Sequence, residues 1–165
     1  MRKNIILVSF FLSLLNSCSK DDSSASINNN AVTANIEGDI FKSSFYNLIT
    51  TIDDTNNNNI ILQLGAFEDN GDGINFVLYN FKGVGKYTLN NAICCDYINY
   101  VNGAIGFGYG TNIFGCSDGS GEINITYADE NKVEGTFSFN GISKDDCNVS
   151  KSVTNGEFSC KFQNQ

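Results

Sequence analysis

The sequence has no histidine, no tryptophan and no proline, and only 10 lysine and arginine residues stand against 18 aspartate and glutamate residues in a chain of 165. Histidine is the one side chain whose unperturbed pKa lies near neutrality, so its absence excludes Ser/His/Asp and Cys/His nucleophiles and histidine-rich metal sites. The formal net charge of −8 argues against nucleic-acid binding, because affinity for a phosphate backbone comes mainly from lysine and arginine. The length and the 41% hydrophobic content suit one modest globular domain, and nothing in the composition indicates a cofactor.

The first residues have the pattern of a secretory signal peptide, with a cationic start at Arg2 and Lys3 and an apolar run over residues 5–15. The run is too short to span roughly 30 Å of hydrocarbon as a helix. Cys18 follows it closely, and a small residue before a cysteine at this point resembles the lipobox of bacterial lipoproteins. The resemblance implies that residues 1–17 are a lipoprotein signal peptide and that Cys18 is acylated as the first mature residue.

Residues 18–30 continue as a lipidated cysteine and a polar segment with almost nothing to bury, which predicts a flexible tether. Ser19-Lys20-Asp21-Asp22 resembles the acidic surface-export signal of Bacteroidota lipoproteins, although acidic residues also simply keep a linker solvated. More than one acyl chain makes membrane attachment effectively permanent. We therefore expect an outer-membrane lipoprotein, exposed at the cell surface, whose membrane contact is the N-terminal lipid.

Residues 31–165 alternate between apolar and polar positions, and this period of two predicts half-buried strands. The clearest alternations place one face at Ile60, Leu62, Leu64 and Ala66, at Ile123, Ile125 and Tyr127, and at Val133, Gly135, Phe137 and Phe139. Turn residues separate the runs, and no window favours a helix. The fold class is therefore all-β, a single antiparallel β-sandwich or β-barrel domain after the signal peptide and tether.

The last strand changes parity along its length. Val153 lies on one parity, whereas Phe158, Cys160 and Phe162 share the other. A β-bulge at Asn155-Gly156 reconciles the two halves, because one extra residue reverses the face on which later side chains lie.

The order of several segments resembles an uncharacterised Bacteroidota lipoprotein family. The segments are the lipobox, Ala34-Asn35-Ile36-Glu37-Gly38, Gly85-Lys86-Tyr87-Thr88-Leu89, Gly121-Glu122-Ile123-Asn124-Ile125, Val133-Glu134-Gly135-Thr136-Phe137-Ser138-Phe139 and Val153-Thr154-Asn155-Gly156-Glu157-Phe158. The resemblance covers most of the mature domain and implies a secreted β domain of unassigned activity. It supplies no catalytic residues, and the cysteines after Cys18 are not part of its pattern.

Five cysteines, Cys94, Cys95, Cys116, Cys147 and Cys160, remain after Cys18. An oxidising envelope favours two disulfides and one free thiol, with the connectivity open. Adjacent cysteines seldom bridge each other, so Cys94 and Cys95 are expected to seek different partners, for which Cys116 and Cys147 are suited by their turn-rich surroundings. A thiolate zinc site needs two closely spaced pairs, and only one is present, so we predict no metal.

The stretch Glu68-Asp69-Asn70-Gly71-Asp72-Gly73 places oxygen atoms and glycine as a calcium-binding loop does. The twelfth place, however, is Tyr79 instead of the bidentate carboxylate that closes such a site. We therefore interpret the stretch as a hairpin loop.

A second glycine-containing stretch has Gly103, Gly106, Gly108 and Gly110 on a strand-like run. No helix follows it, so it lacks the context of a phosphate-binding loop. Such a run predicts a strand with one bare face, against which a neighbouring backbone, a ring or a ligand could lie.

The candidate ligand face is the densest stretch of tyrosine and asparagine, Tyr97, Asn99, Tyr100, Asn102 and Tyr109. These side chains bind sugars by stacking and hydrogen bonding, although core packing explains them equally well.

The acids available for histidine-free acid–base catalysis are Asp118, Glu122, Glu134 and Glu157. Acids on the wet face of a sheet are usually just solvated. We therefore predict a non-catalytic binding module for a glycan or a protein. The alternatives are a structural accessory subunit of a surface complex and, less favoured, a carboxylate-based hydrolase.

Overall fold

The computed structural model describes residues 31–53, 59–90, 96–113, 115–116 and 119–163. Cys18, the tether at residues 19–30, Cys94, Cys95 and Asp118 lie outside these ranges, so the roles expected of them stay predictions. Within the described part of the chain all regular structure is strand. No helix there has the length and apolar character that crossing a membrane requires.

Eleven strands make up the described domain, and they pair antiparallel throughout. Their bounds are β1 Ala31–Ile36, β2 Asp39–Lys42, β3 Phe45–Asp53, β4 Asn59–Phe67, β5 Gly73–Leu78, β6 Gly85–Asn90, β7 Tyr97–Asn102, β8 Phe107–Gly110, β9 Ser120–Ala128, β10 Lys132–Ser143 and β11 Ser150–Lys161. The prediction of an all-β antiparallel domain is confirmed.

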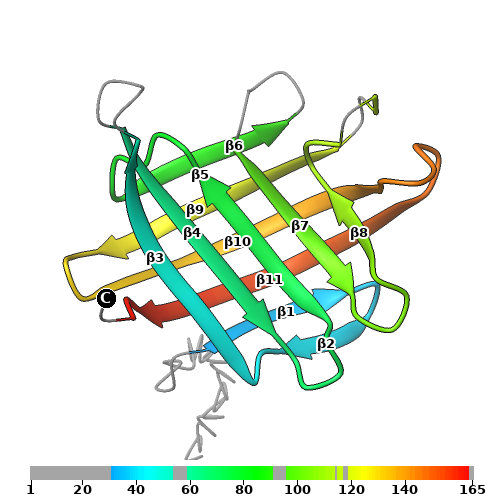
Figure 1. Ribbon diagram of the computed structural model, residues 1–165, viewed down its shortest axis with the longest axis horizontal. Helices are drawn as coiled ribbons and strands as arrows, with labels where there is room; N and C mark the ends of the chain where they lie inside the picture. The colour runs from blue at the N-terminus through cyan, green and yellow to red at the C-terminus, as the bar shows by residue number, and fades with distance from the viewer. Residues whose placement is uncertain (1–30, 54–58, 91–95, 114, 117–118, 164–165) are drawn as a thin grey trace, which may run out of the picture.

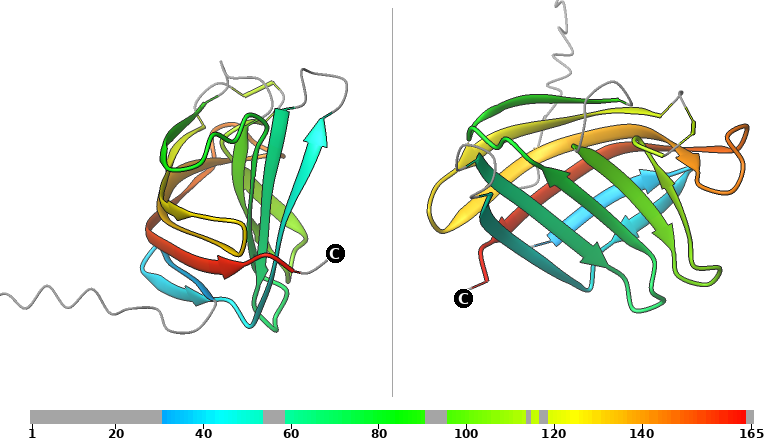
Figure 2. Two further views of the ribbon diagram at one scale, coloured as in Figure 1. Left: turned by 90° about the vertical axis from the view of Figure 1, so that its left-hand side faces the viewer. Right: turned by 45° about the horizontal axis from the view of Figure 1, so that its top comes forward.

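One curled sheet forms the whole fold. Its strand order is β2-β1-β11-β10-β8-β7-β5-β4-β3, and β9 and β6 extend it from β10. Figure 1 shows β3, β4, β5, β7 and β8 as a front layer, crossed by a back layer of β6, β9, β10, β11, β1 and β2. The two layers join where β8 pairs with β10, so the sheet folds over as a half-barrel (Figure 2).

The core fills the space between the two layers. Its largest side chains include Phe76 of the front layer, whose ring centroid lies 5.4 Å from that of Phe158 in the back layer, and Phe137 beside Phe158 at 6.3 Å. Gly135 lies against Phe158, because a Cβ there would come 2.7 Å from the ring. Aromatic rings facing glycines therefore hold the layers together.

The bulge predicted in the last strand is confirmed. The pairing of β10 with β11 shifts between Phe137 and Phe139, and Asn155 has a φ of 50°. Beyond the bulge, Phe158 is 2% exposed and Cys160 is buried, whereas Glu157 is exposed. One extra residue thus resets which side chains enter the core.

A second bulge, which the alternation did not reveal, makes the prediction for Tyr127 wrong. Ile125 pairs with Gly135 and Tyr127 pairs with Glu134, so Thr126 is the extra residue in β9. Tyr127 is consequently 41% exposed on the outer face of the back layer.

A disulfide joins Cys116 and Cys147, with Cα atoms 5.4 Å apart. We expected each of them to pair with Cys94 or Cys95, and this expectation was wrong. The pairing of β8 with β10 brings the β8–β9 and β10–β11 connections together, so the two cysteines in these connections meet each other. Cys160 is a free, buried thiol of β11.

Candidate functional site: an uncharged groove on the front layer

The outer face of the front layer is crossed by three rows of side chains without a charge. Cross-strand pairing defines the rows, because residues opposite each other on neighbouring strands lie on the same face. The first row is Ile49, Gln63, Val77 and Tyr97; the middle row is Asn47, Gly65, Asn75, Asn99 and Gly110; and the third row is Phe45, Phe67, Gly73, Val101 and Gly108. In an acidic protein, this face is neutral.

A hollow of about 330 Å³ lies over the middle row, and we call it the outer groove. Its lining is Asn47, Ile49, Gln63, Leu64, Gly65, Phe67, Asn75, Phe76, Val77, Tyr97 and Asn99. Four of these side chains are amides, contributed by β3, β4, β5 and β7. The groove therefore has a polar, uncharged floor that crosses the strands.

Gly65 keeps the middle of the floor open. A Cβ at this position would come 2.9 Å from Oδ1 of Asn75 and 3.2 Å from the ring of Phe67. Gly73 makes room for the same ring, since a Cβ there would come 2.5 Å from it. The two glycines thus allow Phe67 to lie against the sheet and leave the amide of Asn75 at the floor.

Aromatic side chains stand on both sides of the floor. Phe67 stacks on Phe45 with ring centroids 5.4 Å apart and an interplanar angle of 22°, and Phe45 is 58% exposed. Tyr97 stands on the other side, in the row with Val77. Partial burial, and secondarily the neighbouring Tyr79, raise the pKa of the Tyr97 hydroxyl, so it is a hydrogen-bond donor at neutral pH.

Asn99 contributes an unsatisfied acceptor at the end of the floor. Its Oδ1 is buried and accepts no hydrogen bond from the described residues. A buried amide oxygen without a donor costs about 1–3 kcal/mol. A donor that reaches this amide, after a small rotation of the side chain, is therefore favoured energetically.

The predicted ligand face divides between two sides of the sheet. Tyr97 and Asn99 belong to the outer groove, whereas Tyr100 and Tyr109 face the interior and stack at 6.3 Å. Asn102 lies on the inner side too, with its Nδ2 3.4 Å from the Tyr100 hydroxyl. The prediction of one continuous face was wrong, because successive residues of a strand point to opposite faces.

Tyr100 is held in place by packing and by an acid. It is 4% exposed, and its hydroxyl donates to Oδ2 of Asp72 at 3.0 Å. Burial, followed by this hydrogen bond, raises the pKa of Tyr100 to about 12. Lys151 Nζ lies 5.4 Å from the centre of the Tyr109 ring. These contacts give both tyrosines a structural role inside the barrel.

Groove residues missed by the sequence analysis include Asn47, Gln63, Gly65, Phe67 and Asn75. They come from three strands, and only the register between strands brings them beside Tyr97 and Asn99. The available signal was an amide or glycine on the wet parity of each predicted strand.

The calcium-like stretch is the β4–β5 hairpin connection, as predicted. Its acids bind the protein itself: Glu68 Oε1 accepts the Lys42 amide at 2.8 Å, and Asp72 Oδ1 accepts the Gly103 amide at 2.8 Å. The described residues contain no group of three or more acids or cysteines placed to hold a metal ion.

The glycine run is not one strand, as predicted, but a hairpin between β7 and β8. Gly103 packs against the β4–β5 connection, where a Cβ would come 2.3 Å from the backbone of Gly71. Gly106 has a φ of 66°, as a tight turn requires. Only Gly108 and Gly110 lie in a strand.

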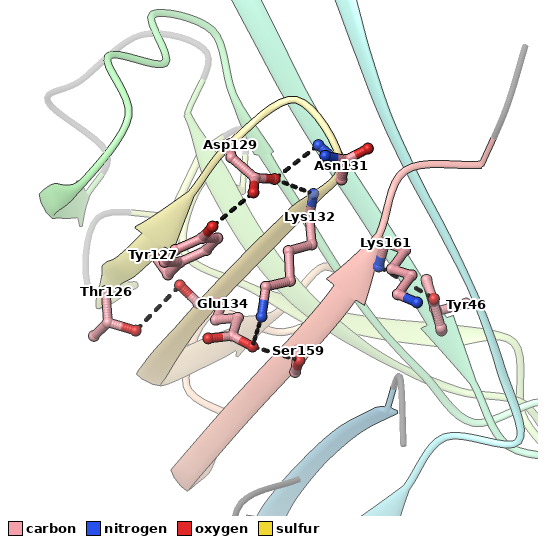
Figure 3. A network of polar contacts seen from close by, with 9 residues as sticks. All are labelled: Tyr46, Thr126, Tyr127, Asp129, Asn131, Lys132, Glu134, Ser159 and Lys161. Carbon is pink, nitrogen blue, oxygen red and sulfur yellow. Dashed lines mark hydrogen bonds and ion pairs between the residues drawn. The ribbon is translucent and has the colours of Figure 1, made fainter. Parts of the chain in front are cut away.

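The acids on the back layer lie on its outer face (Figure 3). Glu122 pairs with Lys86 at 2.9 Å. Glu134 Oε1 accepts from Lys132 Nζ at 2.8 Å and from Ser159 Oγ at 2.9 Å, and these two bonds lower the pKa of Glu134. Glu157 is exposed. The described contacts of Glu122 and Glu134 are those of surface ion pairs.

Comparison with protein-family models matches residues 28–160 to a domain of unknown function, DUF6252. The chain belongs to this family. No curated protein and no solved structure matches it. The match spans β1 to nearly the end of β11, so the half-barrel is the DUF6252 domain.

Proposed function

We propose that this DUF6252 protein is a non-catalytic binding module that takes a neutral glycan in the outer groove. The observation that carries the proposal is the amide floor between two aromatic sides, with no charged residue in its lining. Amides both donate and accept hydrogen bonds, as sugar hydroxyls do, and aromatic faces offer apolar area with a fixed orientation. Phosphate, carboxylate and ammonium groups find no counter-charge there.

The dimensions of the floor suit a short stretch of polysaccharide. Asn47, Gly65, Asn75 and Asn99 lie on four neighbouring strands. Strands are spaced by 4.7–4.9 Å, so the floor is about 14 Å long, enough for about three pyranose rings.

The direction of the groove favours a glycan over a polypeptide at this place. The groove runs across β4 and β5, whose backbone groups are already paired with strands on both sides. An extended peptide gains most when it pairs with an open strand edge. A ligand in the outer groove must instead be bound through side chains, which suits hydroxyl groups.

We further propose that the domain is displayed on the outer membrane by acylation of Cys18. The support is the cationic start, the short apolar run and the lipobox-like cysteine, followed by a polar segment that ends where β1 begins. Replacing Cys18 by alanine should release the protein from the membrane fraction, since acylation would supply the attachment. Unchanged membrane association of Cys18→Ala contradicts the anchoring proposal and leaves the groove proposal unaffected.

Affinity electrophoresis in gels containing soluble neutral polysaccharides (a β-glucan, a xylan and a mannan) tests the binding role. At least one should retard the protein, whereas polygalacturonate should not, because both partners are negatively charged. Tyr97→Ala should abolish the retardation, since it removes the ring on one side of the groove.

Asn75→Asp should also weaken binding, because it puts a charge beside the floor. The matched control is Tyr127→Ala, an exposed tyrosine of the back layer. Retardation that Tyr127→Ala abolishes and Tyr97→Ala leaves intact would place binding elsewhere. No retardation by any of the three polysaccharides would refute the proposal.

A further inference from the structure

The edge strand β3 is only partly covered. Among the described strands it pairs with β4 alone. The chain after β11 covers its first half: the Gln163 amide donates to the Leu48 carbonyl at 3.3 Å, and Gln163 Nε2 donates to the Tyr46 carbonyl at 2.7 Å. Figure 1 shows the end of β11 beside β3. The second half of β3 has no such cover in the described structure.

The uncovered half presents its backbone to the same side. Backbone groups of an antiparallel strand point alternately to its two neighbours. The carbonyls of Tyr46 and Leu48 point away from β4, since they accept bonds from Gln163. Thr50 and Ile52 follow at the same parity, so their N–H and C=O groups also point away from β4. An open strand edge of this kind is a template for a further strand.

A hollow of about 470 Å³ lies beside this edge. Its lining is Ile49, Thr50, Ile60, Phe81, Asp129, Glu130, Phe162 and Gln163. Ile52 pairs with Ile60 across the β3–β4 ladder, and the two side chains are 65% and 45% exposed. The edge therefore offers backbone hydrogen-bonding groups and an apolar place for a side chain together.

The charge of the hollow has one sign. Asp129 and Glu130, at the β9–β10 turn, are its only charged lining residues. The Asp129 carboxylate accepts bonds from the Tyr127 hydroxyl at 2.6 Å and from the amides of Asn131 and Lys132 at 2.7 and 2.8 Å (Figure 3). These contacts keep it ionised at neutral pH.

We propose that the edge of β3 at Thr50 and Ile52 receives an extended strand from a partner protein, with alternating apolar side chains and a basic residue facing Asp129 and Glu130. The apolar side chains enter the hollow beside Ile60 and Phe81, and the basic residue supplies the missing counter-charge. A second copy of this chain fits less well, because pairing two β3 edges would bring the acids of both copies to one seam.

Fluorescence anisotropy with two labelled synthetic peptides tests the proposal on the full chain. One peptide alternates valine with lysine, and its twin alternates valine with glutamate. The lysine peptide should bind and the glutamate peptide should not. Ile52→Pro removes an N–H that points away from β4, so the β3–β4 ladder keeps its bonds while binding weakens. Losing this hydrogen bond and the fit of the strand should weaken binding about tenfold.

A charge control separates the edge from general attraction to an acidic protein. Glu130→Lys should abolish binding of the lysine peptide, whereas Glu157→Lys, the same charge change on the exposed back layer, should leave it nearly unchanged. Equal effects of the two variants, no binding of the lysine peptide, or binding that Ile52→Pro does not alter would overturn the proposal. Concentration-dependent dimerisation that Ile52→Pro abolishes would assign the edge to a second copy and refute the partner strand.

Discussion

Replacing Phe158 by alanine should be among the most destabilising single changes in this domain. Phe158 is 2% exposed, and its ring joins the two layers by lying 5.4 Å from Phe76 and 6.3 Å from Phe137. The space cannot close by movement of the residue beneath it, because Gly135 has no side chain. Phe-to-Ala changes at such sites cost about 3–5 kcal/mol, and poor collapse favours the upper part of that range.

The neighbouring position provides the control. Glu157 precedes Phe158 in β11 and is exposed, so Glu157→Ala should change the free energy of unfolding by less than about 0.5 kcal/mol. Urea unfolding of both variants, followed by far-UV circular dichroism, measures the contrast. A larger loss for Glu157→Ala than for Phe158→Ala would refute the assignment of faces in β11 and the bulge at Asn155.

Three further predictions concern the cysteines and the surface acids. Cys147→Ser should cost about 3–4 kcal/mol by chain entropy, since the disulfide to Cys116 spans a sequence separation of 31, and non-reducing peptide mapping should recover the two cysteines in one linked product. Cys160 should resist alkylation in the native protein and react in denaturant, because burial raises the pKa of its thiol to about 12; rapid native labelling would contradict this. Asp129 and Glu134 have pKa values below those of ordinary carboxyl groups, so the unfolded chain takes up protons first as pH falls, and the stability they add at neutral pH should decline in acid; urea midpoints should fall less with acid in Glu134→Gln than in the wild type.

Local features of the fold were predictable where a side-chain pattern reports directly on burial. The alternations at residues 133–139 and around Phe158 identified strands, inward faces and the bulge near Asn155, since each apolar side chain must leave water. The bulge at Thr126 gave no such signal, because the residues around it suit either face. Tyr127 was therefore placed on the wrong side.

The candidate site shows the same division. Tyr97 and Asn99 were found as a dense local stretch, but Tyr100, which belongs to that stretch, is a core residue. Asn75 and Phe67, which complete the groove, come from other strands, and their positions depend on the register of β4, β5 and β7. The disulfide partner of Cys116 likewise depended on the pairing of β8 with β10.

The sequence by itself determined an acidic, histidine-free, all-β chain, because composition and a period of two depend on each residue and its immediate neighbours. Only the tertiary structure decided which strands are neighbours, and hence that amides from β3, β4, β5 and β7 form one uncharged groove while half of β3 stays open. The reason is physical: strand pairing uses backbone groups that are alike at nearly every residue, so the choice of partner comes from packing the whole core.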